Sequence, residues 1–208
     1  MEFLGKAIAF PDVSKANKEG LLAYGGDLSP ERLVLAYKLG IFPWFDDKEP
    51  ILWWSPDPRF VLFPENLKIS KSMKQLMRNS DFKITVNKDF KGVISNCSKI
   101  KRNGQQGTWI TNDLKKAYIK LHELGVAKSV EVWFNQELVG GLYGVDLNNG
   151  VFCGESMFSK VSNASKVGFI EFIQNTNYKL IDCQVYTNHL ESLGAEEISR
   201  DAFLKFLD

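Results

Sequence analysis

The sequence predicts an α+β fold, with a small N-terminal domain over residues 1–62 and a larger domain over residues 63–208. Three observations favour it. The chain has 208 residues, which suits one large domain with a small companion. Its composition, 44% hydrophobic and 25% charged, is that of an ordinary globular protein. Turns and aromatic residues crowd the first 62 residues, whereas helical and strand-like patterns follow one another afterwards.

The N-terminal segment contains one clear helix and a group of tryptophans. Ser29 and Pro30 are typical of a helix start, and Gly40 is typical of a helix end. Aromatic residues then occupy 41–45 and 51–59 between prolines. Large rings usually pack in the core, which is where we expect Trp53 and Trp54. Trp44 fits either the core or a rigid loop that stacks on a flat base.

The larger domain is expected to mix helices with a meander of strands. Thr111 caps an amphipathic helix, and Gly125 ends it. The expected helices are 70–78, 89–97, 111–124 and 163–175, with short ones near 188–193 and after 199, and the expected strands are 129–134, 138–146, 151–158 and 180–184, with a polar loop at 98–107. This order resembles the core of the acyl-CoA N-acetyltransferase (GNAT) fold, which implies a cleft where two central strands splay.

Charge is distributed unevenly along the chain. Residues 66–107 carry 10 basic and 2 acidic side chains, while the whole chain has a net charge of only +1. Such a segment can bind a polyanion locally. Its helical part places Lys71, Lys74 and Arg78 on one face, with Lys68 beside them. The alternative is a helix face that is merely solvated.

Composition also argues against several classes of protein. The three cysteines form no C-x-x-C pair, and there are only two histidines, so we expect neither a disulfide framework nor a metal site. The sequence shows no signal peptide and no apolar run of about 18 residues. We therefore expect a cytoplasmic protein without a membrane span.

Blocks spread along almost the whole chain resemble one family. They include the run from Trp53 to Arg59, Trp-Trp-Ser-Pro-Asp-Pro-Arg, and the run from Ile181 to Gln184, Ile-Asp-Cys-Gln. The remaining blocks are residues 20–30, 40–45, 107–110, 129–133, 138–145, 154–159 and 163–166. In this order they resemble the leucyl/phenylalanyl-tRNA–protein transferases.

The resemblance implies an aminoacyltransferase. Such an enzyme moves Leu or Phe, and Met less well, from charged tRNA to the α-amine of proteins that begin with Arg or Lys, which marks them for N-end rule degradation. The aminoacyl ester is already activated, so no ATP, metal, cofactor or coenzyme A is expected. The expected partners are aminoacyl-tRNA and the acceptor protein, and the chain is expected to act as a monomer.

Asp182 and Gln184 are the catalytic candidates. Side chains two residues apart on a strand share a face, so both would point into the cleft and Cys183 away from it. The family reading gives Gln184 contact with the amine or the ester carbonyl, and Asp182 orients or polarises it. The proton would leave through Asp182 or through the departing 3′-oxygen of the tRNA. A solvated edge strand and a Cys183–His189–Asp182 nucleophile set are the alternatives, and strand alternation disfavours the second.

The resemblance also implies substrate-binding residues. Glu155 is expected at the terminal adenosine or the acceptor, and Trp44 stacks on the terminal adenine. Strand alternation puts Glu155 and Phe152 on opposite faces, although both are expected near the cleft. A bulge at Gly154 would bring both side chains to the cleft. The hydrophobic amino-acid pocket is expected to contain Trp109, Leu142, Phe152, Met157 and Ile170, and the tRNA body is expected to contact Lys68, Lys71, Lys74, Arg78 and Lys179.

Two other functions fit parts of the sequence. An acetyl-CoA-dependent N-acetyltransferase would need a glycine-containing pyrophosphate turn, but residues 158–166 contain no glycine. A non-enzymatic module that binds tRNA or protein N-termini would leave Asp182 and Gln184 without a role.

Overall fold

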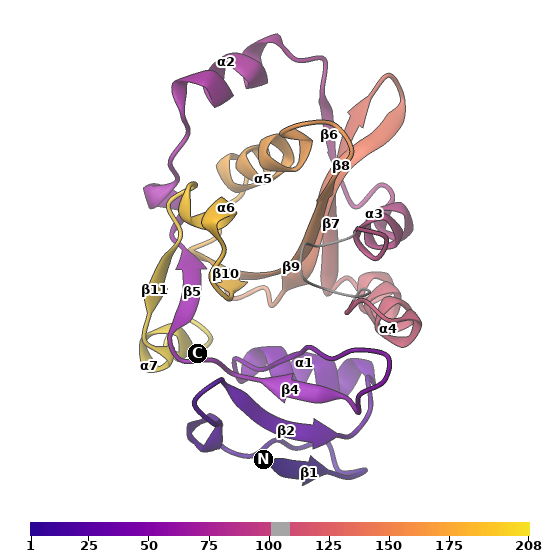
Figure 1. Ribbon diagram of the computed structural model, residues 1–208, viewed down its shortest axis with the longest axis vertical. Coiled ribbons are helices and arrows are strands. Elements are labelled where there is room, and N and C mark those ends of the chain that lie inside the picture. The colour runs from indigo at the N-terminus through magenta and orange to yellow at the C-terminus, as the bar shows by residue number, and fades with distance from the viewer. Residues whose placement is uncertain (101–108) are drawn as a thin grey trace.

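The computed structural model describes residues 1–100 and 109–208, and these residues form two sheets (Figure 1). The smaller sheet has the order β1-β2-β4-β3, and the larger has the order β11-β5-β10-β9-β8-β7-β6. A mixed α/β fold with a small N-terminal unit was predicted, and it is confirmed.

The smaller sheet contains four short strands and is covered by one helix. Its strands are β1 (Glu2–Leu4), β2 (Leu21–Gly25), β3 (Phe42–Pro43) and β4 (Leu52–Trp54), and its helix is α1 (Pro30–Lys38). Pro30 is at the first helical position, where its missing N–H costs nothing. Gly40, at φ 72°, takes the left-handed conformation that ends the helix. The buried face of α1 includes Leu33, Ala36 and Tyr37.

Within the described residues, the larger sheet contains seven strands, and the first of them in the chain, β5, precedes residue 63. Its strands are β5 (Arg59–Leu62), β6 (Lys83–Val86), β7 (Ala127–Phe134), β8 (Glu137–Asp146), β9 (Val151–Ser159), β10 (Leu180–Gln184) and β11 (Glu196–Ile198). Strand β5 lies within residues 1–62, yet it pairs with β10 and β11. The larger sheet therefore begins before residue 63.

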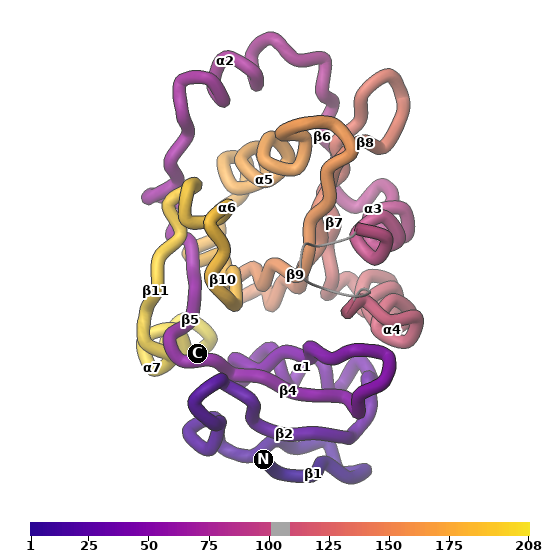
Figure 2. Tube along the Cα trace, in the orientation of Figure 1, coloured from indigo at the N-terminus to yellow at the C-terminus, as the bar shows by residue number. Residues whose placement is uncertain are grey.

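Helices cover both faces of the larger sheet. On one face are α3 (Phe90–Cys97) and α4 (Asn112–Glu123), and on the other is α5 (Ala164–Gln174) (Figure 1). The short helices are η1 (Val13–Lys15), η2 (Pro64–Asn66), α6 (Asn188–Glu191) and α7 (Arg200–Leu204), and α2 (Lys71–Asn79) packs near α5. In Figure 2, α2 and the N-terminal sheet lie at opposite ends of the molecule.

The central strands β9 and β10 are parallel and separate part of the way along. They pair from Val151 to Cys153 on β9 and from Leu180 to Asp182 on β10. Beyond that point β9 pairs only with β8, and β10 soon ends at Gln184. The separation opens the sheet at one place, where the cavity described below lies.

Most of the predicted helices and the four predicted strands of the larger domain are confirmed. The strands β1 to β6 and β11 were not predicted, because each has at most five residues and too little alternation to recognise. The predicted loop at 98–107 falls largely outside the described residues.

Candidate functional site

A cavity of about 420 Å³ lies where β9 and β10 separate. Strands β8, β9 and β10 form its floor, and α5 and α6 contribute to its walls. The segment from Phe42 to Trp44, from the N-terminal unit, closes another side. The cavity therefore draws on both sheets, and most of its lining is apolar.

Glu155 is the centre of the polar end of this cavity. Its Oε1 accepts hydrogen bonds from the Tyr37 hydroxyl at 2.7 Å and from Gln184 Nε2 at 2.7 Å. Its Oε2 is hydrogen bonded to the Tyr118 hydroxyl at 2.9 Å. The two tyrosine hydroxyls also hydrogen bond to each other. Helices α1 and α4 and strand β10 thus meet on one carboxyl group.

Burial dominates the electrostatics of this cluster. It raises the pKa of Glu155 to about 7, although the hydrogen bonds from Tyr37, Tyr118 and Gln184 act in the opposite direction. Burial and the nearby carboxyl group also raise the pKa values of Tyr37 and Tyr118 well above 10. Both tyrosines therefore keep their protons at any physiological pH.

Asp182 is also fully buried, but it has a cationic partner. Arg59 donates from Nε to Oδ1 at 2.8 Å and from Nη2 to Oδ2 at 2.7 Å. The Arg59 guanidinium lies over the rings of Phe42 and Phe203, at 4.8 and 4.6 Å from their centroids. This bidentate geometry favours a firmly held ion pair.

The contact between Asp182 and Gln184 differs from the expected one. The main-chain N–H of Gln184 donates to Asp182 Oδ1 at 2.9 Å, while the side-chain amide of Gln184 donates to Glu155. The carboxyl group that contacts the Gln184 amide is therefore Glu155. Asp182 and Gln184 both border the cavity, as predicted. Cys183 packs in the α5-side cluster, but it also borders the cavity, which strand alternation did not predict.

The Cys183–His189–Asp182 nucleophile set receives no support from the geometry. Burial raises the pKa of Cys183, and its thiol faces the main-chain oxygen of Ile181. Burial also lowers the pKa of His189, so neither group favours a thiolate–imidazolium pair. His189 still borders the cavity.

A β-bulge shapes the floor, but it lies at Glu155. Tyr143 pairs with Ser156 and Gly144 pairs with Gly154, so Glu155 is the extra residue. Phe152 packs in the α5-side cluster with Met157, whereas Glu155 meets the tyrosines on the opposite side. The bulge does not bring Glu155 and Phe152 to one face. Both border the cavity because the strands part there.

The apolar wall contains most of the expected pocket residues. Trp109, Leu142, Phe152 and Met157 line the cavity. Ile170 does not belong to its lining among the described residues. It is completely buried in the core behind it, and α5 contributes Ser165 and Phe169 instead. Helical spacing explains the error, because adjacent residues on a helix point about 100° apart.

Trp44 lies at the rim of the cavity with 36% of its surface exposed. Its main-chain oxygen accepts a hydrogen bond from Trp54 Nε1 at 2.7 Å. The two rings are 5.6 Å apart and tilted. This arrangement fixes an exposed ring beside the opening, and Trp53 is fully buried as expected.

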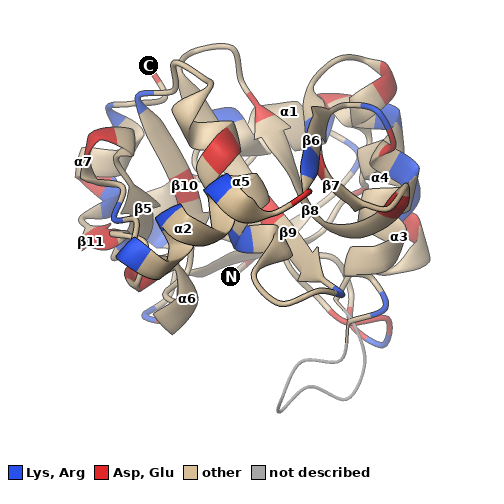
Figure 3. Ribbon diagram, turned by 90° about the horizontal axis from the view of Figure 1, so that it is seen from above, with Lys and Arg blue, Asp and Glu red and all other residues tan. Residues whose placement is uncertain are grey.

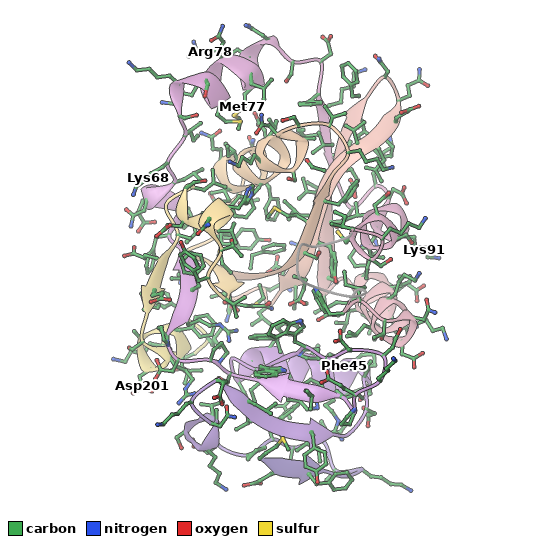
Figure 4. All side chains as sticks on the ribbon, viewed as in Figure 1. Phe45, Lys68, Met77, Arg78, Lys91 and Asp201 are labelled. Carbon is green, nitrogen blue, oxygen red and sulfur yellow. The ribbon has the colours of Figure 1, made fainter. Side chains whose placement is uncertain are left out.

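The predicted basic surface lies on α2. Lys71, Lys74 and Arg78 surround a shallow depression, and Figure 3 shows the basic positions of this helix in blue. Ser70 caps the helix, and Met73 is its only buried residue. In Figure 4 Arg78 points outwards, whereas Met77 points towards α5. Lys68 precedes α2, and Lys179 precedes β10 beside the turn at Gly150.

No role was assigned from the sequence to Tyr37, Tyr118 and Arg59, which hold the two carboxyl groups of the site. Tyr37 and Tyr118 lie on the buried, mostly apolar faces of α1 and α4, a pattern that by itself indicates packing in the core. Arg59 ends a block with family resemblance, but nothing in the sequence indicates its partner. A tyrosine in place of Leu or Phe on a fully buried helix stripe was the available signal, because a buried hydroxyl needs a hydrogen-bond partner.

Within residues 1–100 and 109–208, no group of three or more His, Cys, Asp or Glu side chains is arranged to hold a metal ion. In the same residues, no helix is both long enough and apolar enough to cross a membrane.

Comparison with solved structures found distant likenesses. A conserved protein of unknown function from Staphylococcus epidermidis has a TM-score of 0.46 at 12% identity, covering 86% of this chain and 68% of that chain. A GCN5-related N-acetyltransferase from Kribbella flavida has a TM-score of 0.39 at 8% identity, covering 78% and 58%.

Comparison of sequences gives a much stronger result. A leucyl/phenylalanyl-tRNA–protein transferase from Flavobacterium johnsoniae is 62% identical, covering 100% of this chain and 99% of the relative. Its namesake from Christiangramia forsetii is 58% identical and covers 100% of both chains. The family model for leucyl/phenylalanyl-tRNA protein transferase matches residues 61–208, and the model for its N-terminal domain matches residues 26–57. The chain therefore belongs to the leucyl/phenylalanyl-tRNA–protein transferase family of aminoacyltransferases.

Proposed function

We propose that this protein transfers Leu or Phe, and Met less efficiently, from charged tRNA to the α-amine of cytoplasmic proteins that begin with Arg or Lys. The product would be marked for N-end rule degradation. One observation carries the proposal. An apolar cavity ends at the Glu155–Gln184 pair, so an apolar side chain and a polar reacting centre can be held next to each other.

The cavity suggests where each substrate part binds. The amino-acid side chain would occupy the wall made by Leu142, Phe152 and Met157, which selects by size and tolerates differences in shape. The terminal adenine would stack on Trp44, a contact worth about 1–3 kcal/mol. Trp109 would close the pocket beside it.

The body of the tRNA would bind to the far end of the molecule. Lys71, Lys74 and Arg78 on α2, with Lys68 just before it, offer exposed cations at helical spacing for phosphate oxygens. Lys179 belongs to another element and would add a separate contact.

The chemistry needs little more than orientation. The α-amine attacks the ester carbonyl, a C–N bond forms, the C–O bond to the 3′-oxygen breaks, and that oxygen receives the proton lost by the amine. Gln184 would orient the amine or the ester carbonyl from the polar end of the cavity. Asp182 would act as a positioning residue, because its carboxylate is taken up by Arg59 and by the main chain of Gln184. The protein would act as a monomer without cofactor.

A GNAT-like core, expected over residues 63–208 and extended by β5, with a small N-terminal domain before it, is part of this proposal. The strands β7, β8 and β9 form a meander, and α5 then leads into β10, which is parallel to β9. In this arrangement an activated acyl group would bind where the parallel strands separate.

One assay tests the function. Purified protein is incubated with radiolabelled Leu-tRNA and a peptide that begins with Arg, with and without coenzyme A. We expect labelled peptide in both cases, and little product with an otherwise identical peptide that begins with Asp. Absence of product, or a requirement for coenzyme A, would reject the proposal.

A further inference from the structure

Three polar side chains meet the carboxyl group of Glu155, and the hydrogen-bonding capacity of each can be counted. The Tyr37 and Tyr118 hydroxyls contact each other, and each also contacts one carboxyl oxygen of Glu155. Together with the carboxyl group itself, these three oxygen–oxygen contacts form a closed ring. Gln184 Nε2 adds a contact to Oε1 from outside the ring.

A closed ring of three oxygen contacts needs three protons. Each tyrosine hydroxyl supplies one. If Glu155 is ionised, both tyrosines donate to it and no proton remains between their own oxygens. If Glu155 is protonated on Oε2, it donates to Tyr118, Tyr118 donates to Tyr37, and Tyr37 donates to Oε1. Only the acid form places one proton in every contact.

We propose that Tyr37 and Tyr118 hold Glu155 as a carboxylic acid, and that this ring acts as a positioning device that sets the direction of the Gln184 side-chain amide. The first part rests on the geometry alone. The second part rests on the function proposed above, because it assigns the amide a substrate to face.

The ring determines which end of the Gln184 amide faces Glu155. The carboxyl proton is used inside the ring, so Oε1 is a carbonyl oxygen with one lone pair left for a partner. Only the NH2 group of Gln184 can satisfy it, which agrees with the 2.7 Å contact from Nε2. The carbonyl oxygen of the amide is then free to accept a hydrogen bond from the α-amine of the acceptor.

The surroundings of Glu155 favour the acid form. Charged or titratable groups on neighbouring elements are Tyr37 on α1, Tyr118 on α4, Tyr143 on β8, Cys153 on β9, Asp182 on β10 and Arg59 on β5. The only cation among them, Arg59, is engaged by Asp182, whose negative charge opposes ionisation of Glu155. Burial raises the pKa of Glu155 to about 7, in agreement with the proton count.

The first experiment observes the proton directly. Protein labelled with 13C at the glutamate side-chain carboxyl carbons is titrated by NMR, and Glu155→Gln identifies the Glu155 signal by its absence. We expect this signal to titrate more than about one pH unit above the ordinary glutamate value of about 4.3. A midpoint at or below the ordinary value would overturn the proposal, whether or not the protein transfers amino acids.

The second experiment tests the positioning role. Glutamine at 155 can donate to Tyr118 and accept from Tyr37 and Gln184, so Glu155→Gln mimics the acid. In single-turnover transfer from Leu-tRNA at pH 6.5, we expect Glu155→Gln to remain within about threefold of the wild type, and Glu155→Ala to lose about 10–100-fold with unchanged tRNA binding. Equal loss in both variants would show that a carboxylate is required.

The tyrosines supply a matched pair of tests. Tyr37→Phe and Tyr118→Phe each remove one hydroxyl from the ring, and we expect each to slow transfer by about tenfold without changing tRNA affinity. Tyr178→Phe is the control, because it removes a partly buried hydroxyl that donates to Asp146 at 2.8 Å, outside the ring. It should transfer at the wild-type rate. Wild-type rates in both ring variants would contradict the positioning role.

If the wild type transfers nothing, the proposed function fails, and the NMR titration still decides the state of Glu155.

Discussion

Two buried carboxyl groups lie within the same site, on neighbouring strands, in opposite electrostatic surroundings. Asp182 on β10 has a guanidinium fork on both oxygens, which compensates its charge. Glu155 on β9 meets two phenol hydroxyls and an amide, none of which carries charge. Burial alone therefore does not determine what a carboxyl group does. The nature of its partner decides whether it is a fixed charge or holds a proton.

Removing the guanidinium should give the largest effect. Arg59→Met leaves the Asp182 carboxylate buried without its cation, and we expect the free energy of unfolding to fall by about 3–5 kcal/mol. Urea denaturation measures this. The double variant with Asp182→Asn should recover part of the loss, because the unpaired charge is gone. If the loss of stability in the double variant instead equals the sum of the losses in the two single variants, the two side chains do not stabilise the fold as an ion pair.

The second carboxyl group should respond to pH. The pKa of Glu155 is raised in the folded protein to about 7, while its unfolded value is near 4.3. Its contribution to stability is therefore complete below about pH 4 and is lost as pH rises through 7. Relative to Glu155→Gln, the wild type should lose about 2–4 kcal/mol between pH 4 and pH 8. Parallel pH profiles of the two proteins in urea denaturation would contradict this.

Asp182→Asn separates a positioning role from a proton-transfer role. Asp182 accepts a hydrogen bond from the main-chain N–H of Gln184 and so helps to hold Gln184 in place. We therefore expect single-turnover transfer by Asp182→Asn to fall by about 10–100-fold while tRNA affinity is retained. Raising the pH above 8, where the acceptor amine is already neutral, should not restore the rate. Recovery at high pH would instead show that Asp182 assists deprotonation, and a wild-type rate throughout would remove it from the mechanism.

These two carboxyl groups also show how far the sequence could be interpreted. Strand alternation predicted that Asp182 and Gln184 would face the cavity and that Cys183 would point away from it. Asp182 and Gln184 do border the cavity, but so does Cys183, because β10 is irregular between Asp182 and Gln184, where Gln184 has φ 65°. The partners could not be predicted, since Arg59 is 123 residues from Asp182 and Tyr37 is 118 residues from Glu155. The extra residue at Glu155 also shifts the alternation of β9.

Helices were easier to predict than short strands for the same reason. Thr111 and Ser70 cap their helices through hydrogen bonds to a backbone N–H three residues later, a signal contained within one turn. The strands of the N-terminal sheet depend on neighbours that lie far away in the chain, such as Leu52 opposite Tyr24. The N-terminal unit was therefore the least predictable part, although it provides Tyr37 and Trp44 to the site.

Exposed charges on α2 should show the smallest effect on stability and a clear effect on binding. Lys74 and Arg78 face solvent around a shallow depression, so replacing both with Ala should change the free energy of unfolding by less than about 1 kcal/mol. Each lost phosphate contact should lower the slope of log affinity against log salt by about 0.7–0.9 for tRNA.

Lys38→Ala, at the end of α1, is a control that removes one cation from another helix and should leave the slope unchanged. Filter binding of uncharged tRNA at several salt concentrations measures the slope, and urea denaturation measures the free energy of unfolding. An unchanged slope in the α2 variant would place this helix outside the tRNA interface. A reduced slope with unchanged stability would show that, unlike the charge of Asp182, these cations interact with a ligand and leave the fold unaffected.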